Sequence, residues 1–274
     1  MINCLSIDLE DWFCGIESIK FSDWSGFESR IMPETEKLLG LLDEYDVKAT
    51  FFVLGYIAEK YPEIIRKVSS AGHEIALHGY SHQLVYDQSH KDFELDLKKA
   101  LDIVGDIAQK KIVGYRAPLF SVTEESLWAM KILYAYGIRY DCSIYPFKTS
   151  IFGIKDSERY KYEIELAESE KIIELPSSTV RILGRNIPFA GGFFLRFWHY
   201  NFIKWAIRTV NSEGSPAVIY IHPFDLDPEI PVIEGISAKR RFVHYHNIRS
   251  TERKLNALLS DFEFQPIGQY LKIL

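Results

Sequence analysis

Two histidines at a spacing suited to metal binding, His78 and His82, follow a short apolar run. A lone pair of this kind is weak evidence, because many surface loops carry two histidines. A second apolar run, near the N-terminus, leads into three carboxylates, Asp8, Glu10 and Asp11. Such crowding of negative charge is costly unless a cation neutralises it. Together these groups offer the donors of an open catalytic zinc site, with one carboxylate left to act as a base.

The segments around these residues alternate between strand-like and helix-like patterns, which predicts a parallel sheet, open or closed as a barrel. In such sheets functional groups gather at the C-terminal ends of the strands, where Asp8 and His78 would lie. Two stretches, 145–170 and 188–200, lack clear periodicity and are predicted to be long loops near the site. The predicted strands are 2–8, 48–53, 73–78, 111–115, 138–141 and 217–221, and the predicted helices are 28–45, 61–72, 89–109, 123–136, 200–211 and 250–259.

Length and composition set the class of protein. With 274 residues, 47% of them hydrophobic, residues 1–274 are expected to form one large catalytic domain. The net charge of −6 provides no basic stripe, so we expect no nucleic-acid partner. A signal peptide and a run of about 18 apolar residues are both missing, so we expect a cytoplasmic protein without membrane insertion. Three cysteines without a Cys-x-x-Cys pair argue against disulfides and a thiolate zinc site.

The chain resembles the polysaccharide deacetylases of the NodB-homology type, also called carbohydrate esterase family 4. Further stretches resemble the subgroup found in exopolysaccharide and PEP-CTERM/exosortase gene loci. The resemblance implies a distorted (β/α) barrel, in the α/β class, and a metal-dependent carbohydrate N-deacetylase. The five family motifs appear in order at residues 8–11, 78–82, 114–118, 140–143 and 219–223, and the subgroup stretches are 190–196, 222–228 and 241–245.

The resemblance also implies roles for the metal-binding residues. His78, His82 and one acid would bind a divalent metal, most simply Zn²⁺, although cobalt, nickel or iron would suit the same donors. The family usually has two adjacent aspartates where this chain has Asp8-Leu9-Glu10-Asp11. Glu10 shares a strand face with Asp8, whereas Asp11 is the shorter acid usual at that position, so both stay open as the acidic ligand.

The resemblance implies an acid and a base as well. Asp8 would remove a proton from the attacking water, and His222 would protonate the leaving amine. Arg116 is expected to pair with Asp8 and keep it ionised, and Asp141 is expected to hold His222 in the required tautomer.

Four residues are expected to contact the substrate. Tyr115, or a backbone amide next to Arg116, is a candidate for the oxyanion hole, and Pro118 follows in the same motif. Trp12 belongs to a set of aromatic residues that would line a sugar groove, although core packing would explain it equally well. Arg196 lies among aromatic residues and is expected to contact a carboxylate or phosphate of the substrate.

Taken together, these features predict removal of an N-acetyl group from an amino sugar of a surface polysaccharide or its precursor. The substrate would be nucleotide-linked, lipid-linked or an oligosaccharide, and the oligomeric state stays open. A first alternative keeps the scaffold but acts as an N-deformylase or a cyclic amide or imide hydrolase. A second is a catalytically silent carbohydrate-binding protein, against which the full set of acid, base and metal-binding residues argues.

Overall fold

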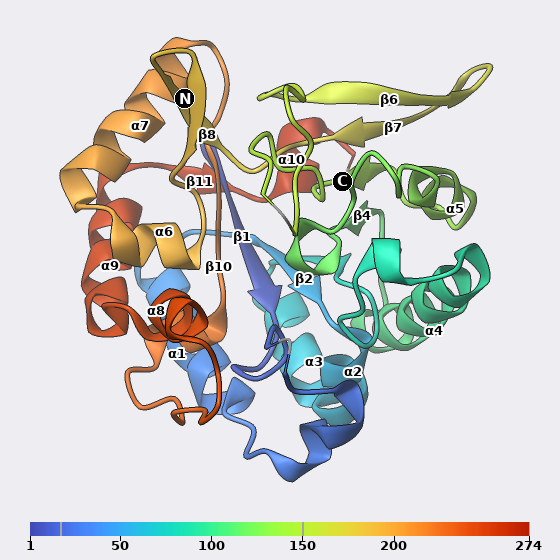
Figure 1. Cartoon of the computed structure of the whole chain (residues 1–274), viewed down its shortest axis with the longest axis horizontal. Coiled ribbons are helices and arrows are strands. Elements are labelled where there is room, and N and C mark those ends of the chain that lie inside the picture. Colours follow the sequence, from blue (N-terminus) through green and yellow to red (C-terminus); the bar gives the residue numbers. More distant parts are fainter. Residues whose placement is uncertain (17, 150, 274) are drawn as a thin grey trace.

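The computed structural model describes residues 1–16, 18–149 and 151–273. Strands lie at the centre and helices surround them (Figure 1). The strands are β1 (Asn3–Leu9), β2 (Thr50–Val53), β3 (Glu74–Leu77), β4 (Gly114–Tyr115), β5 (Tyr140–Asp141), β6 (Tyr162–Ala167), β7 (Glu170–Glu174), β8 (Thr179–Ile182), β9 (Arg185–Pro188), β10 (Val218–Ile221) and β11 (Phe264–Gln265). The α-helices are α1 (Ile31–Glu44), α2 (Gly55–Lys60), α3 (Pro62–Ser70), α4 (His90–Ala108), α5 (Ala129–Ala135), α6 (Gly192–Phe197), α7 (Tyr200–Ser212), α8 (Ala238–Tyr245), α9 (Thr251–Asp261) and α10 (Ile267–Leu271).

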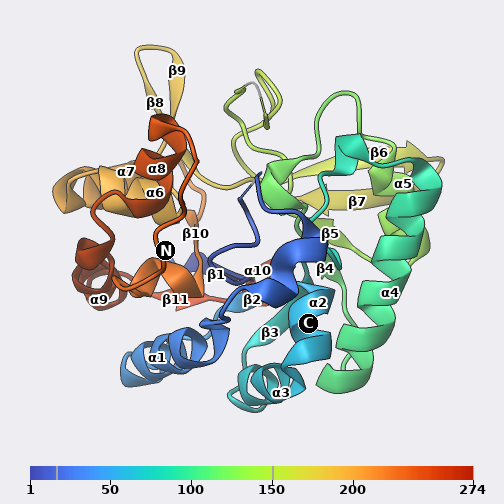
Figure 2. The same ribbon diagram turned by 60° about the horizontal axis from the view of Figure 1, so that its bottom comes forward.

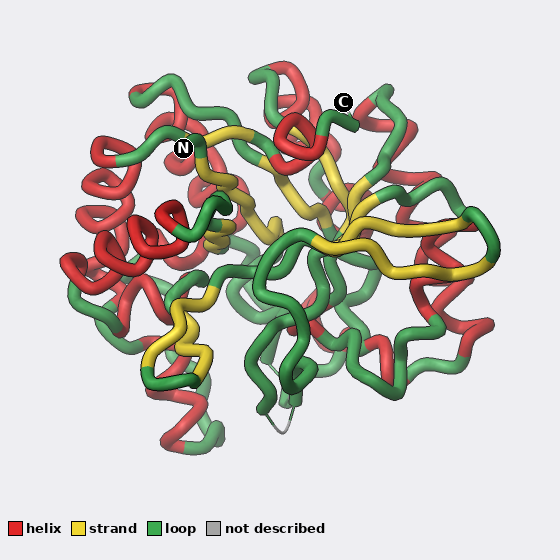
Figure 3. The backbone as a smooth tube through the Cα atoms, turned by 90° about the horizontal axis from the view of Figure 1, so that it is seen from above, coloured by secondary structure: helices red, strands yellow, loops and turns green. Residues whose placement is uncertain are grey.

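The main sheet runs in the order β10-β1-β2-β3-β4-β5-β7-β6, and β11 adds to β1. Its neighbours pair in parallel except β6, which pairs antiparallel with β7. Beyond β7 the chain returns to the other edge, where the Ser178 amide donates to the Val218 carbonyl of β10 at 3.2 Å. The sheet therefore curves back on itself, as the strands show from above in Figure 3. The prediction of a distorted (β/α) barrel is confirmed.

Side chains along the strands alternate between two apolar clusters, as the period of two requires. On β2, Phe51 and Val53 belong to the larger cluster, whereas Phe52 belongs to a smaller one with Cys4 of β1. Strand β1 is buried along its whole length, as expected for a parallel strand with neighbours on both sides. Asp8 is four residues from Cys4, so it lies on the same face of β1 as the smaller cluster.

Local signals fix several helix ends. Helix α4 begins after Ser89, whose hydroxyl accepts a hydrogen bond from the Asp92 amide at 3.2 Å, and it ends at Gln109 in a left-handed conformation. Pro62 opens α3, where its missing N–H costs nothing. Figure 2 shows α3 and α4 on one side of the strands and α6, α7, α8 and α9 grouped on the other.

Three predictions about secondary structure are wrong. The stretch 145–170 contains β6, whose half-buried and exposed residues alternate, a period-two signal hidden among charged side chains. The stretch 188–200 contains the short helix α6. The helix predicted for 123–136 spans only Ala129–Ala135, because Ser126 takes part in a turn, accepting from the Thr123 amide at 2.8 Å.

Within the described residues, no helix is both long enough and apolar enough to span a membrane.

A candidate metal centre and active site

The strand ends bring together residues that are far apart in the sequence. Because the strands are parallel, their C-terminal ends lie at the same edge of the sheet. The residues at these ends are Asp8 within the last two residues of β1, Glu10 directly after β1, His78 and His82 after β3, Arg116 after β4 and His222 after β10.

Three of these side chains converge on one point. Their donor atoms, from Glu10, His78 and His82, all lie within 4.8 Å of one another, and all three residues are buried. Oε2 of Glu10 is 2.8 Å from Nε2 of His82 and 3.9 Å from Nε2 of His78. That oxygen has no aligned hydrogen-bond donor among the described residues. A carboxylate and two imidazoles aimed at a shared point fit a divalent cation.

The turn after β3 allows the second histidine to face the first. Gly79 and His82 both have positive φ angles, 74° and 55°, so the chain doubles back within four residues. The centroids of the two imidazole rings are 5.4 Å apart.

Asp11, the other candidate ligand, is turned away from this cluster. Its carboxylate accepts hydrogen bonds from the backbone amides of Trp12 and Arg30, at 3.1 and 3.2 Å, and from the Ser29 hydroxyl. Burial raises the pKa of Asp11, and these hydrogen bonds counter the shift only in part. The carboxylate therefore ties the loop after β1 to the start of α1.

Arg116 orients both sides of the candidate site. Its backbone carbonyl accepts from Nδ1 of His78 at 2.8 Å, which leaves Nε2 free to bind a metal. Its guanidinium donates to Oδ1 of Asp8 at 2.6 Å. Burial alone would lower the pKa of Arg116, but Asp8, together with smaller contributions from Cys142 and Tyr220, raises it. The expected Arg116–Asp8 pair is therefore present.

His222 completes the group from the opposite side. Its Nε2 lies 3.5 Å from Oε1 of Glu10, and its Nδ1 lies 2.9 Å from Oδ2 of Asp225. Burial alone would lower the pKa of His222, but Asp225, Glu10 and Asp8 together raise it to about 9. The imidazole is therefore a stable proton carrier at neutral pH.

The expectation that Asp141 holds His222 is wrong. Asp141 accepts from the amide and the hydroxyl of Ser143, at 2.9 and 2.6 Å, and Ser143 in turn accepts from the Ala117 amide at 2.7 Å. Asp225, which the sequence reasoning missed as a functional residue, holds His222 instead. A signal was present, because an aspartate three residues after a histidine at a strand end can bond back across a single turn.

Arg196 does not reach outward to a substrate. It is only 3% exposed, and its guanidinium donates to the backbone carbonyls of Gly192, Val243, His244 and His246. It also lies 3.2 Å from Asp225. The substrate-binding prediction is wrong because every side of the guanidinium is enclosed by α6 and α8.

The oxyanion-hole candidates are also engaged elsewhere. Tyr115 is buried and its ring packs against Phe93. The Arg116 amide donates to Leu77 at 2.9 Å, and the Ala117 amide donates to Ser143. These two amides hold β3, β4 and the following loop together, so neither is free to bind an oxyanion, and the role of Tyr115 stays a prediction.

The two remaining residues predicted to contact the substrate, Trp12 and Pro118, are both buried. Trp12 is 2% exposed, packs edge-on against Phe13 and Phe27, and donates its indole N–H to the Glu28 carbonyl at 3.0 Å. Pro118 is buried and packs next to Gly79. Both residues pack within the loops that surround the candidate site.

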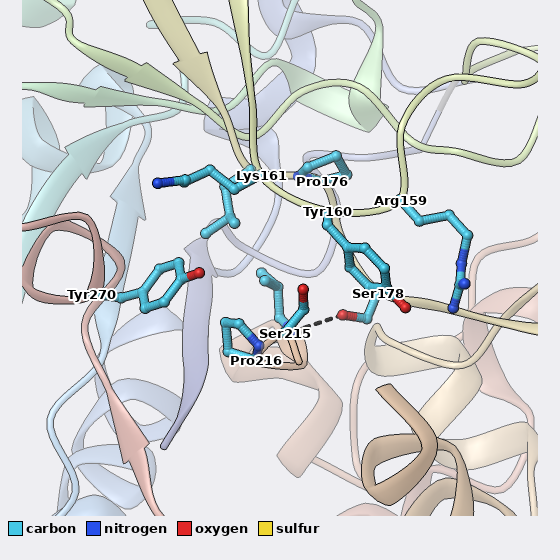
Figure 4. A pocket seen from close by; sticks show the side chains of 10 residues that line it. Arg159, Tyr160, Lys161, Pro176, Ser178, Ser215, Pro216 and Tyr270 are labelled. Atoms are coloured by element: carbon cyan, nitrogen blue, oxygen red, sulfur yellow. Dashed lines mark hydrogen bonds between the residues drawn. The ribbon is translucent and has the colours of Figure 1, made fainter. Parts of the chain in front are cut away.

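A separate small cavity lies at the other end of β10 (Figure 4). Its volume of about 10 Å³ suits one water molecule. Its lining includes Pro216 and Val218 at the start of β10, whereas His222 follows the end of that strand. It is therefore distinct from the candidate active site.

Comparison with known proteins gives two adjoining matches. Residues 24–138 match the family model described as polysaccharide deacetylase, and residues 142–272 match a domain of unknown function, DUF3473. A peptidoglycan deacetylase of Helicobacter pylori is 33% identical over 108 residues, which are 39% of this chain and 36% of that protein. The chain thus aligns with about a third of that relative's length.

Solved structures extend the likeness to the whole fold. A candidate polysaccharide deacetylase from Mycobacterium smegmatis superposes with a TM-score of 0.64 at 22% identity, covering 99% of this chain and 90% of that one. The allantoinase PuuE superposes with a TM-score of 0.62 at 14% identity, covering 98% and 88%. At these identities the likeness shows a shared fold.

Proposed function

We propose, from the premise that the chain belongs to the polysaccharide deacetylase family, that it is a metal-dependent hydrolase of the N-acetyl group of an amino sugar. The sugar would belong to a surface polysaccharide or its precursor. The observation that carries this proposal is the convergence of Glu10, His78 and His82 opposite His222.

Glu10, His78 and His82 are the proposed metal ligands, and Zn²⁺ is the proposed ion. The fit is supported by the convergent donors and by the use of Nδ1 of His78 in a bond to a carbonyl. A cation bound there would polarise the amide carbonyl of the substrate and lower the pKa of a water molecule.

Asp8 is the proposed general base. It lies on the inner face of β1, and the Arg116 guanidinium fixes the orientation of its carboxylate. An ionised carboxylate in this place can take a proton from the water that attacks the amide. Burial of the Arg116–Asp8 pair also keeps both partners from turning outward to solvent.

His222 is the proposed general acid. An amine is a poor leaving group until its nitrogen is protonated, so the reaction needs a proton donor on that side of the amide. Nε2 of His222 faces the site, whereas Nδ1 is held by Asp225. The ring can therefore donate from one nitrogen while the other keeps its hydrogen bond.

Three wider features belong to the same proposal. The whole chain would act as one catalytic domain, because residues from both family matches and from the N-terminal strand share one site. A cytoplasmic location is supported by three buried free cysteines, Cys4, Cys14 and Cys142. A substrate on a nucleotide or lipid carrier would fit that location.

The test is product analysis on the purified chain. An N-acetylglucosamine oligomer and a nucleotide-linked N-acetylamino sugar are incubated with the zinc-loaded protein, with chelated protein and with chelated protein given zinc again. Acetate and free amine should appear in equal amounts, disappear on chelation and return with zinc. Formate from a formamido sugar, without acetate from its acetyl analogue, would favour the deformylase alternative. Saturable sugar binding without product in the zinc-loaded protein would favour the silent carbohydrate-binding alternative.

A further inference from the structure

A buried carboxylate stands directly behind the His222 ring. Oδ2 of Asp225 is 2.9 Å from Nδ1 of His222 and also accepts the His222 backbone N–H at 3.0 Å. Two contacts from one oxygen fix both the backbone and the imidazole. Asp225 lies within the 3₁₀ turn Pro223–Leu226 that follows β10, and it is completely buried.

Arg196 holds the other side of this carboxylate. Its Nε lies 3.2 Å from Oδ1 of Asp225, which makes an ion pair, and donates its hydrogen to the Gly192 carbonyl of α6. The other guanidinium nitrogens donate to carbonyls of α8 and of His246, which follows α8. A buried carboxylate is unstable without a compensating charge, and Arg196 is such a charge. Figures 1 and 2 both show α6 and α8 on the side of β10.

The sequence next to Arg196 is adapted to the same carboxylate. A Cβ atom at Gly192 would lie 1.8 Å from Oδ2 of Asp225, and one at Gly191 would lie 2.6 Å from the Tyr220 ring. Gly191 also has φ of 132°, which other residues rarely adopt. Gly192 therefore leaves the space in which Asp225 can reach His222, and Gly191 leaves the space for the Tyr220 ring.

Ring contacts fix the plane of the imidazole. Phe224 stacks on His222 with ring centroids 4.6 Å apart and an angle of 12° between the planes. Tyr220 meets the same ring edge-on at 5.7 Å. Rotation of His222 would break these contacts as well as the bond to Asp225.

We propose that the segment matched as a domain of unknown function supplies the proton-donating half of the active site, through the series His222, Asp225 and Arg196. His222 is the catalytic acid, and Asp225 and Arg196 are positioning residues. This inference rests on the proposed amide hydrolysis. It gives residues 142–272 a chemical task that is separate from metal binding, which belongs to Glu10, His78 and His82.

The proton step balances without any further reactant. As the C–N bond of the tetrahedral intermediate breaks, its electron pair goes to nitrogen and the Nε2 proton of His222 joins that nitrogen. The imidazole becomes neutral and keeps its Nδ1 hydrogen, which stays bonded to Asp225. The next proton reaches Nε2 from the water that was deprotonated in the attack, by way of Asp8 or solvent.

The test compares two substrates with different leaving groups. An N-acetylated sugar needs a proton on its leaving nitrogen, whereas an aryl acetate releases a phenolate that needs none. In the zinc-loaded enzyme, Asp225→Asn should lower kcat for the sugar amide by about 10- to 100-fold and for the aryl acetate by less than about 3-fold. Arg196→Lys, which cannot reproduce the planar fork of donors, should show the same selective loss at smaller size. Asp261→Asn, a surface change, is the matched control.

A second arm tests whether the effect passes through His222. In a His222→Ala background, Asp225→Asn should cause no further loss on the amide. Equal losses on both substrates, or a full additional loss in that background, would overturn the inference while leaving the proposed function standing. If the unaltered enzyme releases no acetate from any amide, the proposed function fails and the inference fails with it. Arg196→Lys carries the test if Asp225→Asn does not fold.

Discussion

His78 and His222 are both packed into one site, yet they are prepared for opposite chemistry. Nδ1 of His78 is bonded to a neutral carbonyl, that of Arg116, whereas Nδ1 of His222 is bonded to the carboxylate of Asp225. Burial lowers the pKa of His78 to about 3, and the attraction of Glu10 only partly opposes it. For His222 the effect of burial is outweighed, and the pKa rises to about 9.

The partner of the inner nitrogen therefore decides what the outer nitrogen can do. A neutral imidazole offers a lone pair and suits a metal, whereas an imidazolium offers a proton and suits a leaving amine. The two sides of the site come from different parts of the chain. His78 lies in the polysaccharide deacetylase match, whereas His222 lies in the domain of unknown function.

The largest expected effect separates these two histidines. His78→Ala should lower the bound metal from about one ion per chain to nearly none and abolish turnover, because one of three donors is lost. His222→Ala should keep its metal and lose about 10²- to 10⁴-fold in kcat on the amide, as expected for a general acid. Metal content by plasma mass spectrometry, with kinetics on the same samples, checks both. Loss of metal from His222→Ala would erase the distinction between the two sides.

A second contrast concerns the two acids that sequence alone left open. Glu10→Ala should lose the metal. Asp11→Ala should keep it but unfold about 1 to 3 kcal/mol more easily, because three donors in the loop after β1 would lose their acceptor. Metal content and urea denaturation measure the two outcomes. A metal-free Asp11→Ala protein that is still folded would return Asp11 to the list of ligands.

The next effect is a shift in the titration of one ring. In chelated protein, the His222 ring should titrate near pH 9, and in Asp225→Asn its pKa should fall, because burial would then be opposed less. The raised pKa adds stability that is fully present below pH 6.5 and is lost as the pH rises through 9. Histidine ring signals in NMR follow this directly. An unchanged His222 titration in Asp225→Asn would show that Asp225 does not set its charge.

Much of the site could be predicted because strand ends obey a simple rule. His78 is the last residue of a predicted parallel strand, and Arg116 and His222 each directly follow one, so their meeting at one edge needed no tertiary detail. The Arg116–Asp8 pair was predicted instead from the resemblance to the polysaccharide deacetylases. The Glu10 or Asp11 question could not be settled in this way, because it depends on which carboxylate the loop after β1 turns toward Ser29 and Arg30.

Other features depended on packing between distant segments. Arg196 was predicted to contact substrate because aromatic residues surround it in sequence, yet α6 and α8 enclose it. The sequence also left open whether Trp12 lines a groove or belongs to the core, because its burial depends on packing against Phe27 across a loop. Asp225 is local to His222, but the space for its carboxylate comes from Gly192, more than thirty residues earlier in the chain. No periodicity in the sequence signals such a contact.

The smallest expected effect belongs to Asp141, the aspartate first expected to support His222. Burial raises the pKa of Asp141. Burial and the nearby charge of Asp141 also raise the pKa of Glu174. The two carboxyl groups therefore favour sharing a proton. Asparagine has nearly the shape of a protonated aspartic acid and is also neutral. Asp141→Asn should therefore change kcat by less than about 10-fold. It should change the free energy of unfolding by about 1 kcal/mol, the scale of one altered hydrogen bond. Parallel kinetics of Asp141→Asn and Asp225→Asn on the same sugar amide measure the difference. If Asp141→Asn were the more damaging of the two on the amide alone, the support of His222 would have to pass through Ser143 and Arg116 rather than through Asp225.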